Sequence, residues 1–311
     1  GMASVEALTK ALADQLKLSE TRVFTASTGV IGEPLPFDRI TQKLGELNKA
    51  LSDTAINDAA EAIRTTDTFA KGAGKTVLVG GQSVQIAGIA KGSGMIAPDM
   101  ATMLVYIFTD AEIAQPDLQV LLGTLTDSTF NCITVDSDTS TSDTLMCAAT
   151  GASGVDVTDS AGFTQALRGV MLDLAHQVVR DGEGATKFVE IRVSGAASDA
   201  EARTVGLSIA NSPLVKTAIA GEDPNWGRVV MAIGKAGSQI DLKKLSIKFG
   251  NIKLIQDGKL HQGYDEKIVA NYMKNENIDL NIEISTGAKN FTVYTMDLTN
   301  EYIKINADYR S

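Results

Sequence analysis

The stretch KGSGMIAPDMATML, Lys91 to Leu104, places an Ala-Thr bond between a glycine-rich turn and a run of apolar residues. Two interpretations account for this junction. In the first, glycine simply suits the turn and threonine suits the strand predicted at residues 103–108. In the second, the chain cleaves its own bond between Ala101 and Thr102, and Thr102 becomes an N-terminal nucleophile. The choice depends on which other nucleophile-base pairs the chain offers.

Histidine is scarce in this chain, which contains only His176 and His261. Neither stands in a recognisable nucleophile motif, so a Ser-His-Asp or Cys-His arrangement is not expected, and we interpret both histidines as structural. A nucleophile without a histidine can use its own α-amino group as the base, but only a residue at a chain terminus has one. The scarcity of histidine therefore favours self-cleavage at Thr102.

The composition excludes several classes of partner. The chain has 311 residues, is 44% hydrophobic and carries a formal net charge of -10 with no block of basic residues, which argues against nucleic acid and anionic membranes as partners. Its apolar runs are far shorter than the ~20 residues that cross a bilayer, and the N-terminus lacks a signal-peptide pattern. We therefore expect a cytoplasmic protein. Cys132 and Cys147 are too few for a disulfide framework, so reduced thiols are expected.

Local patterns predict a mixture of strands and helices. Residues 75–79 and 84–89 are strand patterns around Gly80-Gly81, which is typical of a β-hairpin. The stretch FAKGAGKT, residues 69–76, ends like a phosphate-binding loop but has Phe69 where that motif requires glycine, so we predict a turn. The other predicted segments are strands at residues 103–108, 132–135 and 188–193, and helices at residues 142–149, 161–179, 200–210 and 226–233.

These segments predict the fold class. Because strands and helices do not alternate strictly, we expect an α+β layered architecture with largely antiparallel or mixed sheets. From residue 245 onward short strand patterns dominate, which predicts a smaller C-terminal subdomain from about residue 240.

The loop DSDTSTSD, residues 136–143, is dense in oxygen ligands and invites a calcium or magnesium interpretation. Its spacing lacks the glycine and the terminal glutamate of an EF-hand loop, so we favour a polar loop with a helix cap. No metal site is predicted.

Long motifs are spread over the chain in a fixed order. They are STGVIGEPLP at residues 27–36, TTDT at 65–68, KGSGMIAPDMATML at 91–104, FNCITVDSDTSTSDT at 130–144, VRDGEGATKFVEI at 179–191, SPLVKTAIAGEDPNWGR at 212–228 and INADYRS at 305–311. Together they resemble the ornithine acetyltransferase family, the bifunctional glutamate N-acetyltransferases of arginine biosynthesis. Residues 245–302 match that family in general character only.

The resemblance implies a self-cleaved protein with an N-terminal-nucleophile-like fold of helix-sheet-sheet-helix layers. Cleavage between Ala101 and Thr102 would give an α chain of residues 1–101 and a β chain of residues 102–311. The hydroxyl of Thr102 would attack the preceding carbonyl in an N-to-O acyl shift, and after hydrolysis of the resulting ester the free amine would serve as base. Two αβ units are expected to pair into an α2β2 heterotetramer.

The same resemblance implies the reaction and the site. Thr102 takes the acetyl group of N2-acetyl-L-ornithine and passes it to L-glutamate. Thr28 and Gly29 match the pair that stabilises the oxyanion of the tetrahedral intermediate. The positions that match substrate-binding residues are Thr65, Lys91, Thr102, Glu183, Asn306 and Ser311. Lys91 would meet an α-carboxylate and Glu183 a cationic amine. No bound cofactor is implied, and no motif decides whether acetyl-coenzyme A is a further co-substrate.

The chain departs from the family pattern at several places, among them Ala70, which replaces a frequent proline. Family members carry a further N-terminal segment, Ser137 stands where they commonly have glycine, and Ser142 where they commonly have asparagine. If the glycine position needs a positive φ, Ser137 carries strain. Two other functions stay open: a self-processing aminopeptidase-like hydrolase of the same broad fold, in which water resolves the acyl-enzyme, and, prompted by these departures, an inactive binding or assembly subunit.

Overall fold

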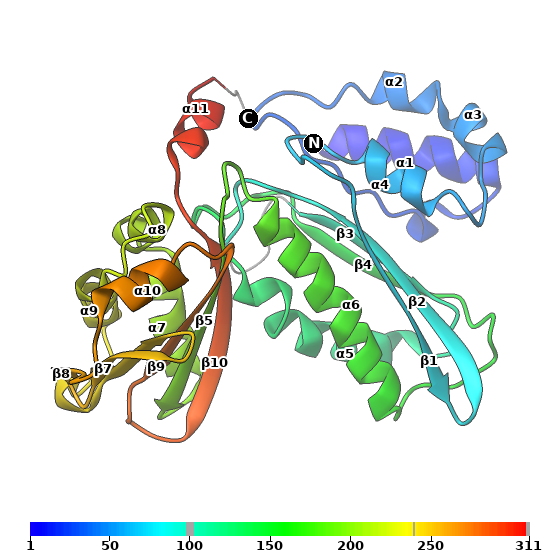
Figure 1. Ribbon diagram of the computed structural model, residues 1–311. Helices are drawn as coiled ribbons and strands as arrows, with labels where there is room; N and C mark the ends of the chain where they lie inside the picture. Colours follow the sequence, from blue (N-terminus) through cyan, green and yellow to red (C-terminus); the bar gives the residue numbers. More distant parts are fainter. Residues whose placement is uncertain (98–102, 239, 309–311) are drawn as a thin grey trace.

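Two β-sheets with helices packed on them organise the chain (Figure 1). The structure is a computed structural model and describes residues 1–97, 103–238 and 240–308. One sheet has the strand order β1-β2-β3-β4 and the other the order β10-β5-β9-β6-β7-β8. The α+β class predicted from the sequence is confirmed. None of the helices in these ranges is both long and apolar enough to cross a bilayer.

The elements have the following bounds. The strands are β1 (Lys71–Val79), β2 (Gln82–Lys91), β3 (Leu104–Thr109), β4 (Thr144–Ala149), β5 (Phe188–Ala196), β6 (Ser246–Phe249), β7 (Ile252–Gln256), β8 (Lys259–Leu260), β9 (Asn277–Glu283) and β10 (Lys289–Met296). The α-helices are α1 (Met2–Leu16), α2 (Phe37–Thr41), α3 (Leu44–Lys49), α4 (Ile56–Ala62), α5 (Gln115–Asp127), α6 (Ala161–Arg180), α7 (Asp199–Ala210), α8 (Pro213–Ala220), α9 (Trp226–Gly234), α10 (Glu266–Tyr272) and α11 (Asn300–Asp308). Short 3-10 helices are η1 (Glu20–Arg22), η2 (Phe130–Cys132) and η3 (Leu242–Lys244).

The four-stranded sheet is built around the predicted hairpin. β1 and β2 pair antiparallel around Gly80 and Gly81, whose φ angles of 58° and 84° are those that glycine adopts without a steric cost. The predicted turn at residues 69–76 is wrong from Lys71 onward, because the backbone there is already paired with β2. β3 continues the sheet antiparallel to β2, and β4 pairs parallel to β3.

The predicted helix at residues 142–149 is wrong, because Thr144–Ala149 forms strand β4. Leu145 and Cys147 lie opposite Val105 and Ile107 of β3 and pack against the same core. A six-residue apolar run fits a buried strand and a buried helix equally well by periodicity, and the pairing with β3 decides for the strand.

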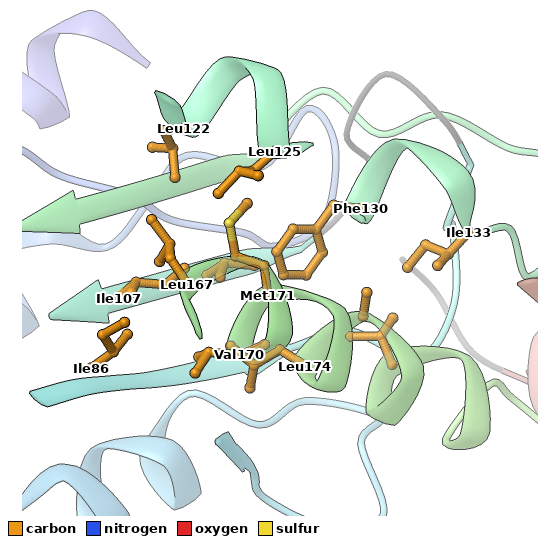
Figure 2. Packing of buried hydrophobic residues seen from close by; sticks show 14 of the residues in the cluster. Ile86, Ile107, Leu122, Leu125, Phe130, Ile133, Leu167, Val170, Met171 and Leu174 are labelled. Carbon is orange, nitrogen blue, oxygen red and sulfur yellow. The ribbon is translucent and has the colours of Figure 1, made fainter. Parts of the chain in front are cut away.

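α6 covers one face of this sheet (Figure 2). Ser160 caps the helix by accepting a hydrogen bond from the Phe163 N–H, and apolar residues then recur every three or four positions. Leu174 lies so close to the sheet that a Cβ at Gly88 would sit 3.0 Å from its Cδ1 atom. A side chain at position 88 would therefore press Leu174 away from the sheet.

The six-stranded sheet carries the second core. α7 packs on β5 and β10, and the apolar side chains of α7, α8, α9, α10 and the sheet form one buried cluster. The strands that follow residue 240 share this sheet with β5, because β9 pairs parallel to β5 and β6 pairs antiparallel to β9. The subdomain boundary at about residue 240 stays a prediction.

The prediction of a strand at residues 132–135 is wrong. These residues link the two sheets instead. Ile133 makes a single bridge to Tyr294 of β10, and Val135 donates its N–H to the Ile96 carbonyl at 2.8 Å. This apolar segment pairs with β10 through one residue only, and its other partner is the loop after β2, so no β-ladder forms. This link between the sheets brings the aspartate-rich loop, residues 136–143, next to the glycine-rich turn after β2.

Candidate active site

Six of the residues predicted from the sequence line one pocket of about 690 Å³, a volume that includes its open mouth. They are Thr28, Gly29, Thr65, Lys91, Glu183 and Asn306. They come from the loop before α2, the loop after α4, the end of β2, the loop after α6, and α11. Figure 1 shows α11 beside the loop that leads into α2. The predicted residues Ala101, Thr102 and Ser311 lie outside the described residues, and their roles stay predictions.

The glycine-rich turn after β2 forms the floor of the pocket. A Cβ at Gly94 would meet both carboxylate oxygens of Glu183, at 2.5 and 2.6 Å. Gly92 has a φ of 147°, which L side chains rarely adopt, and a Cβ there would also press on Met103 at 3.1 Å. A side chain at Gly94 would therefore displace the Glu183 carboxylate, and one at Gly92 would strain the backbone and press on Met103.

Asp136 holds the far side of this turn. Its carboxylate accepts the backbone N–H groups of Met95 at 2.7 Å and of Ile96 at 2.9 Å. Tyr302 of α11 donates its hydroxyl to the same carboxylate at 3.3 Å. Burial raises the pKa of Asp136, although the two N–H donors act in the opposite direction. This aspartate joins the turn to α11.

Asp143 fixes the entry into β3. Its Oδ1 atom accepts the Met103 N–H at 2.7 Å, and the Met103 carbonyl accepts the Thr144 N–H at 3.0 Å. Oδ2 is buried and has no hydrogen-bond partner among residues 1–97, 103–238 and 240–308. Burial raises the pKa of Asp143 to about 7, while the positive charge of Lys91 opposes the shift. The backbone of Met103 is thus held at both its N–H and its carbonyl.

Two opposite charges face the pocket. Lys91 is 2% exposed, and burial lowers its pKa, while the carboxylates of Asp67 and Glu183 act to raise it. Glu183 is held by its backbone N–H, which donates to Ser93 at 2.8 Å, and by Asn306, which donates its amide N–H to Oε2 at 2.8 Å. A pocket with a buried cation and a buried carboxylate suits a small molecule that carries both charges.

The aspartate-rich loop serves the backbone in this structure. In place of the predicted helix cap, Asp136 and Asp143 accept N–H groups about forty residues away in sequence. The described part of the chain contains no group of three or more His, Cys, Asp or Glu side chains placed to hold a metal ion. Ser137 has a φ of 68°, so the strain expected at this position is present.

Sequence reasoning missed Asp136, Asp143 and Tyr302 as parts of the site. The only signal was the density of aspartates in residues 136–143, and it does not reveal which distant amides those carboxylates accept.

Two helix-covered sheets, and a pocket assembled by distant loops at the end of β2 and next to the start of β3, define an α+β protein with a candidate active site. The chain belongs to the ArgJ family, whose model matches residues 1–311. The resemblance found in the sequence motifs is thereby confirmed.

Relatives that match this chain carry the name arginine biosynthesis bifunctional protein ArgJ. The protein from Ruegeria pomeroyi is 64% identical, over 100% of this chain and 76% of its own length. The protein from Caulobacter vibrioides is 49% identical, over 100% of this chain and 79% of its own length. The crystal structure of arginine biosynthesis bifunctional protein ArgJ from Bacillus halodurans is 39% identical, with a TM-score of 0.64 over 66% of this chain and 98% of that chain.

Proposed function

We propose that this chain transfers the acetyl group of N2-acetyl-L-ornithine to L-glutamate through an acetyl-Thr102 intermediate, after it has cleaved its Ala101-Thr102 bond. Membership of the ArgJ family makes the chain an enzyme of arginine biosynthesis, a glutamate N-acetyltransferase. The observation that carries the more detailed proposal is the meeting of six predicted residues around one pocket, next to the point where β3 begins.

The chemistry begins with maturation. The Thr102 hydroxyl attacks the Ala101 carbonyl carbon, the C–N bond of that peptide breaks, and the proton passes to the departing nitrogen. This shift frees the α-amino group of Thr102, and water then hydrolyses the ester, which frees the Thr102 hydroxyl and leaves a carboxylate on Ala101. Two hydrogen bonds support this proposal, because they anchor the residue that follows the nucleophile. Asp143 accepts the Met103 N–H, and the Met103 carbonyl accepts the Thr144 N–H.

Transfer then proceeds in two halves. The α-amino group takes the hydroxyl proton while the Thr102 oxygen attacks the acetyl carbonyl, and Thr28 and Gly29 stabilise the oxyanion that forms. The tetrahedral intermediate collapses, the amide C–N bond breaks, and ornithine leaves with the proton on its nitrogen. The amine of glutamate attacks the acetyl ester in the second half, which releases N-acetyl-L-glutamate and the free threonine.

The charges of the pocket fit these substrates. Lys91 would bind the α-carboxylate that both substrates carry, because a buried cation gains most from a charge-assisted hydrogen bond. Glu183 would bind the cationic side chain of the ornithine moiety, with Asn306 as its neighbour. A transfer assay with acetyl-coenzyme A in place of N2-acetyl-L-ornithine tests whether it is an alternative acetyl donor.

The sheet supports the proposal that the two products of cleavage stay together. β2 ends at Lys91 and β3 begins at Leu104, and these strands pair from Ile86 opposite Thr109 to Lys91 opposite Leu104. A cut between them therefore leaves α and β chains joined in one sheet. From the family resemblance we further propose an α2β2 heterotetramer and a cytoplasmic location.

Replacement of the nucleophile tests the proposed function. Thr102→Ala should abolish both cleavage and formation of N-acetyl-L-glutamate, whereas Thr102→Ser keeps a hydroxyl and should retain part of both. Normal transfer by an uncleaved Thr102→Ala protein would contradict the mechanism. Free acetate without transfer would favour the hydrolase, and substrate binding by a cleaved chain without turnover would favour the binding subunit.

A further inference from the structure

A fully buried lysine lies behind the pocket. Lys71, the first residue of β1, is 0% exposed, and its Nζ atom donates to Asp67 Oδ1 at 2.6 Å and to Asp181 Oδ2 at 2.5 Å. Lys71 is not among the residues that line the pocket. A buried ammonium group is costly unless it is paired, and here it is paired twice.

The first partner, Asp67, holds two segments of the pocket wall. Its Oδ1 atom also accepts the Gly92 N–H at 2.6 Å, and its Oδ2 atom accepts the Thr65 N–H at 3.0 Å. Gly92 follows Lys91 directly. Asp67 therefore fixes the backbone next to the pocket cation and the backbone of Thr65.

The second partner, Asp181, follows the last turn of α6 and precedes Glu183 by two residues. Its carboxylate accepts the Thr68 N–H at 3.0 Å and the Thr68 hydroxyl. The loop after α6 is thereby tied to the segment that carries Thr65. A contact of 2.5 Å between the Thr66 and Ser93 hydroxyls joins the same segment to the glycine-rich turn.

The charge balance makes the lysine necessary for this arrangement. Burial acts to raise the pKa of Asp67, but the N–H of Gly92 and the ammonium group of Lys71 outweigh it, so the pKa is lowered and the carboxylate stays ionised. Without Lys71, the two buried carboxylates would lose the ammonium group that contacts both of them. One of them would then take up a proton and accept its backbone N–H donors less strongly.

We propose that Lys71 is a positioning residue of the pocket: it orients Asp67 and Asp181, and through them the three segments that carry Thr65, Lys91 and Glu183. Lys71 touches no substrate and takes no part in the chemistry. The positioning of the segments stands on the geometry alone, while its effect on catalysis rests on the proposed function.

The test compares two buried lysines. Lys71→Met removes the proposed positioning group without adding bulk. Lys187→Met is the matched control, because Lys187 is 8% exposed and its Nζ atom contacts Glu222 and the Asn275 carbonyl, both outside the pocket, at 3.3 Å. Hydrogen exchange is measured for peptides that cover residues 65–68 and 91–94, and KM for N2-acetyl-L-ornithine is measured on the same preparations.

The expected result is local. In Lys71→Met the two peptides should exchange at least about tenfold faster than in the wild type, and KM should rise about tenfold while kcat falls less. In Lys187→Met both readouts should stay within about twofold of the wild type, whatever the loss of thermal stability. Unchanged exchange at both peptides, or faster exchange spread evenly over the chain, would overturn the positioning role.

Two further comparisons keep the inference falsifiable. If Lys71→Met does not fold, the double variant Lys71→Met/Asp181→Asn returns the cluster to one carboxylate in excess and should fold, with the same local rise in exchange. A double variant that folds with wild-type exchange would overturn the proposal. If the wild-type chain shows no transfer, the proposed function fails, and the exchange data still decide the role of Lys71.

Discussion

Replacement of Gly94 by alanine adds one methyl group at the point where the glycine-rich turn meets Glu183. The new Cβ would lie 2.5 Å from Oε2 and 2.6 Å from Oε1 of that glutamate, where ordinary contacts begin at 3.4 Å. Gly94 does not have a positive φ, so alanine fits the backbone itself. The strain therefore falls on the carboxylate of Glu183.

The size of the effect follows from these distances. The carboxylate has to move by about 0.9 Å, the difference between 3.4 and 2.5 Å, and it lies at the flexible end of its side chain. The Glu183 N–H stays hydrogen-bonded to the Ser93 carbonyl, so the cost in folding free energy should stay below about 1 kcal/mol. A misplaced carboxylate loses a charge-assisted hydrogen bond of about 1.5–3 kcal/mol, which corresponds to an increase of about 10- to 150-fold in KM.

Steady-state kinetics and thermal unfolding of the same protein separate these two effects. We expect Gly94→Ala to raise KM for N2-acetyl-L-ornithine by that factor, with a melting temperature within a few degrees of the wild type. Gly123→Ala in α5 is the control, because a Cβ there meets nothing within 4 Å and alanine favours a helix. A Gly94→Ala protein with wild-type KM would refute the inference that Glu183 binds substrate from this position.

Three further changes test the aspartate-rich loop. Ser137→Gly should raise the free energy of unfolding by about 1 kcal/mol, because serine at a φ of 68° pays a steric cost that glycine does not; an unchanged urea midpoint would contradict this. Asp136→Ala should lower it by about 3 kcal/mol, because two N–H groups at residues 95–96 lose a charged acceptor; a loss below about 1 kcal/mol in the same denaturation would argue against that role. Burial raises the pKa of Asp143 from 3.8 to about 7, so the folded chain binds this proton more tightly than the unfolded chain. The stability that this proton contributes is present below about pH 4 and is lost as the pH rises through about 7. Asp143→Asn should remove that part of the pH dependence, and identical pH slopes of thermal unfolding for variant and wild type would exclude it.

Local chemistry made one part of the fold predictable. The hairpin around Gly80-Gly81 and the strand after Met103 follow from turn residues and apolar runs, and the structure confirms both. β4 was not predictable by the same means, because residues 144–149 become a strand only by pairing with β3.

The candidate site, too, was predictable from the sequence only in part. Long motifs identified Lys91 and Glu183 by resemblance, and both line the pocket. The groups that hold them were hidden, because each acts over a long sequence separation: Asp143 accepts an N–H forty residues away, and Lys71 reaches Asp181 across 110 residues. In the sequence, Lys71 lies inside a stretch that resembles a phosphate-binding loop. Only the structure reveals that its side chain is buried and paired with Asp67 and Asp181.

The central claim is that Thr102 is both the cleavage product and the acetyl carrier. Intact-protein mass spectrometry of the purified chain, incubated with N2-acetyl-L-ornithine and quenched in acid, tests both parts in one spectrum. The account predicts two fragments that meet between Ala101 and Thr102, with the mass of one acetyl group added to the fragment that begins at Thr102. A single uncut chain that still forms N-acetyl-L-glutamate, or an acetyl group on the other fragment, would contradict it.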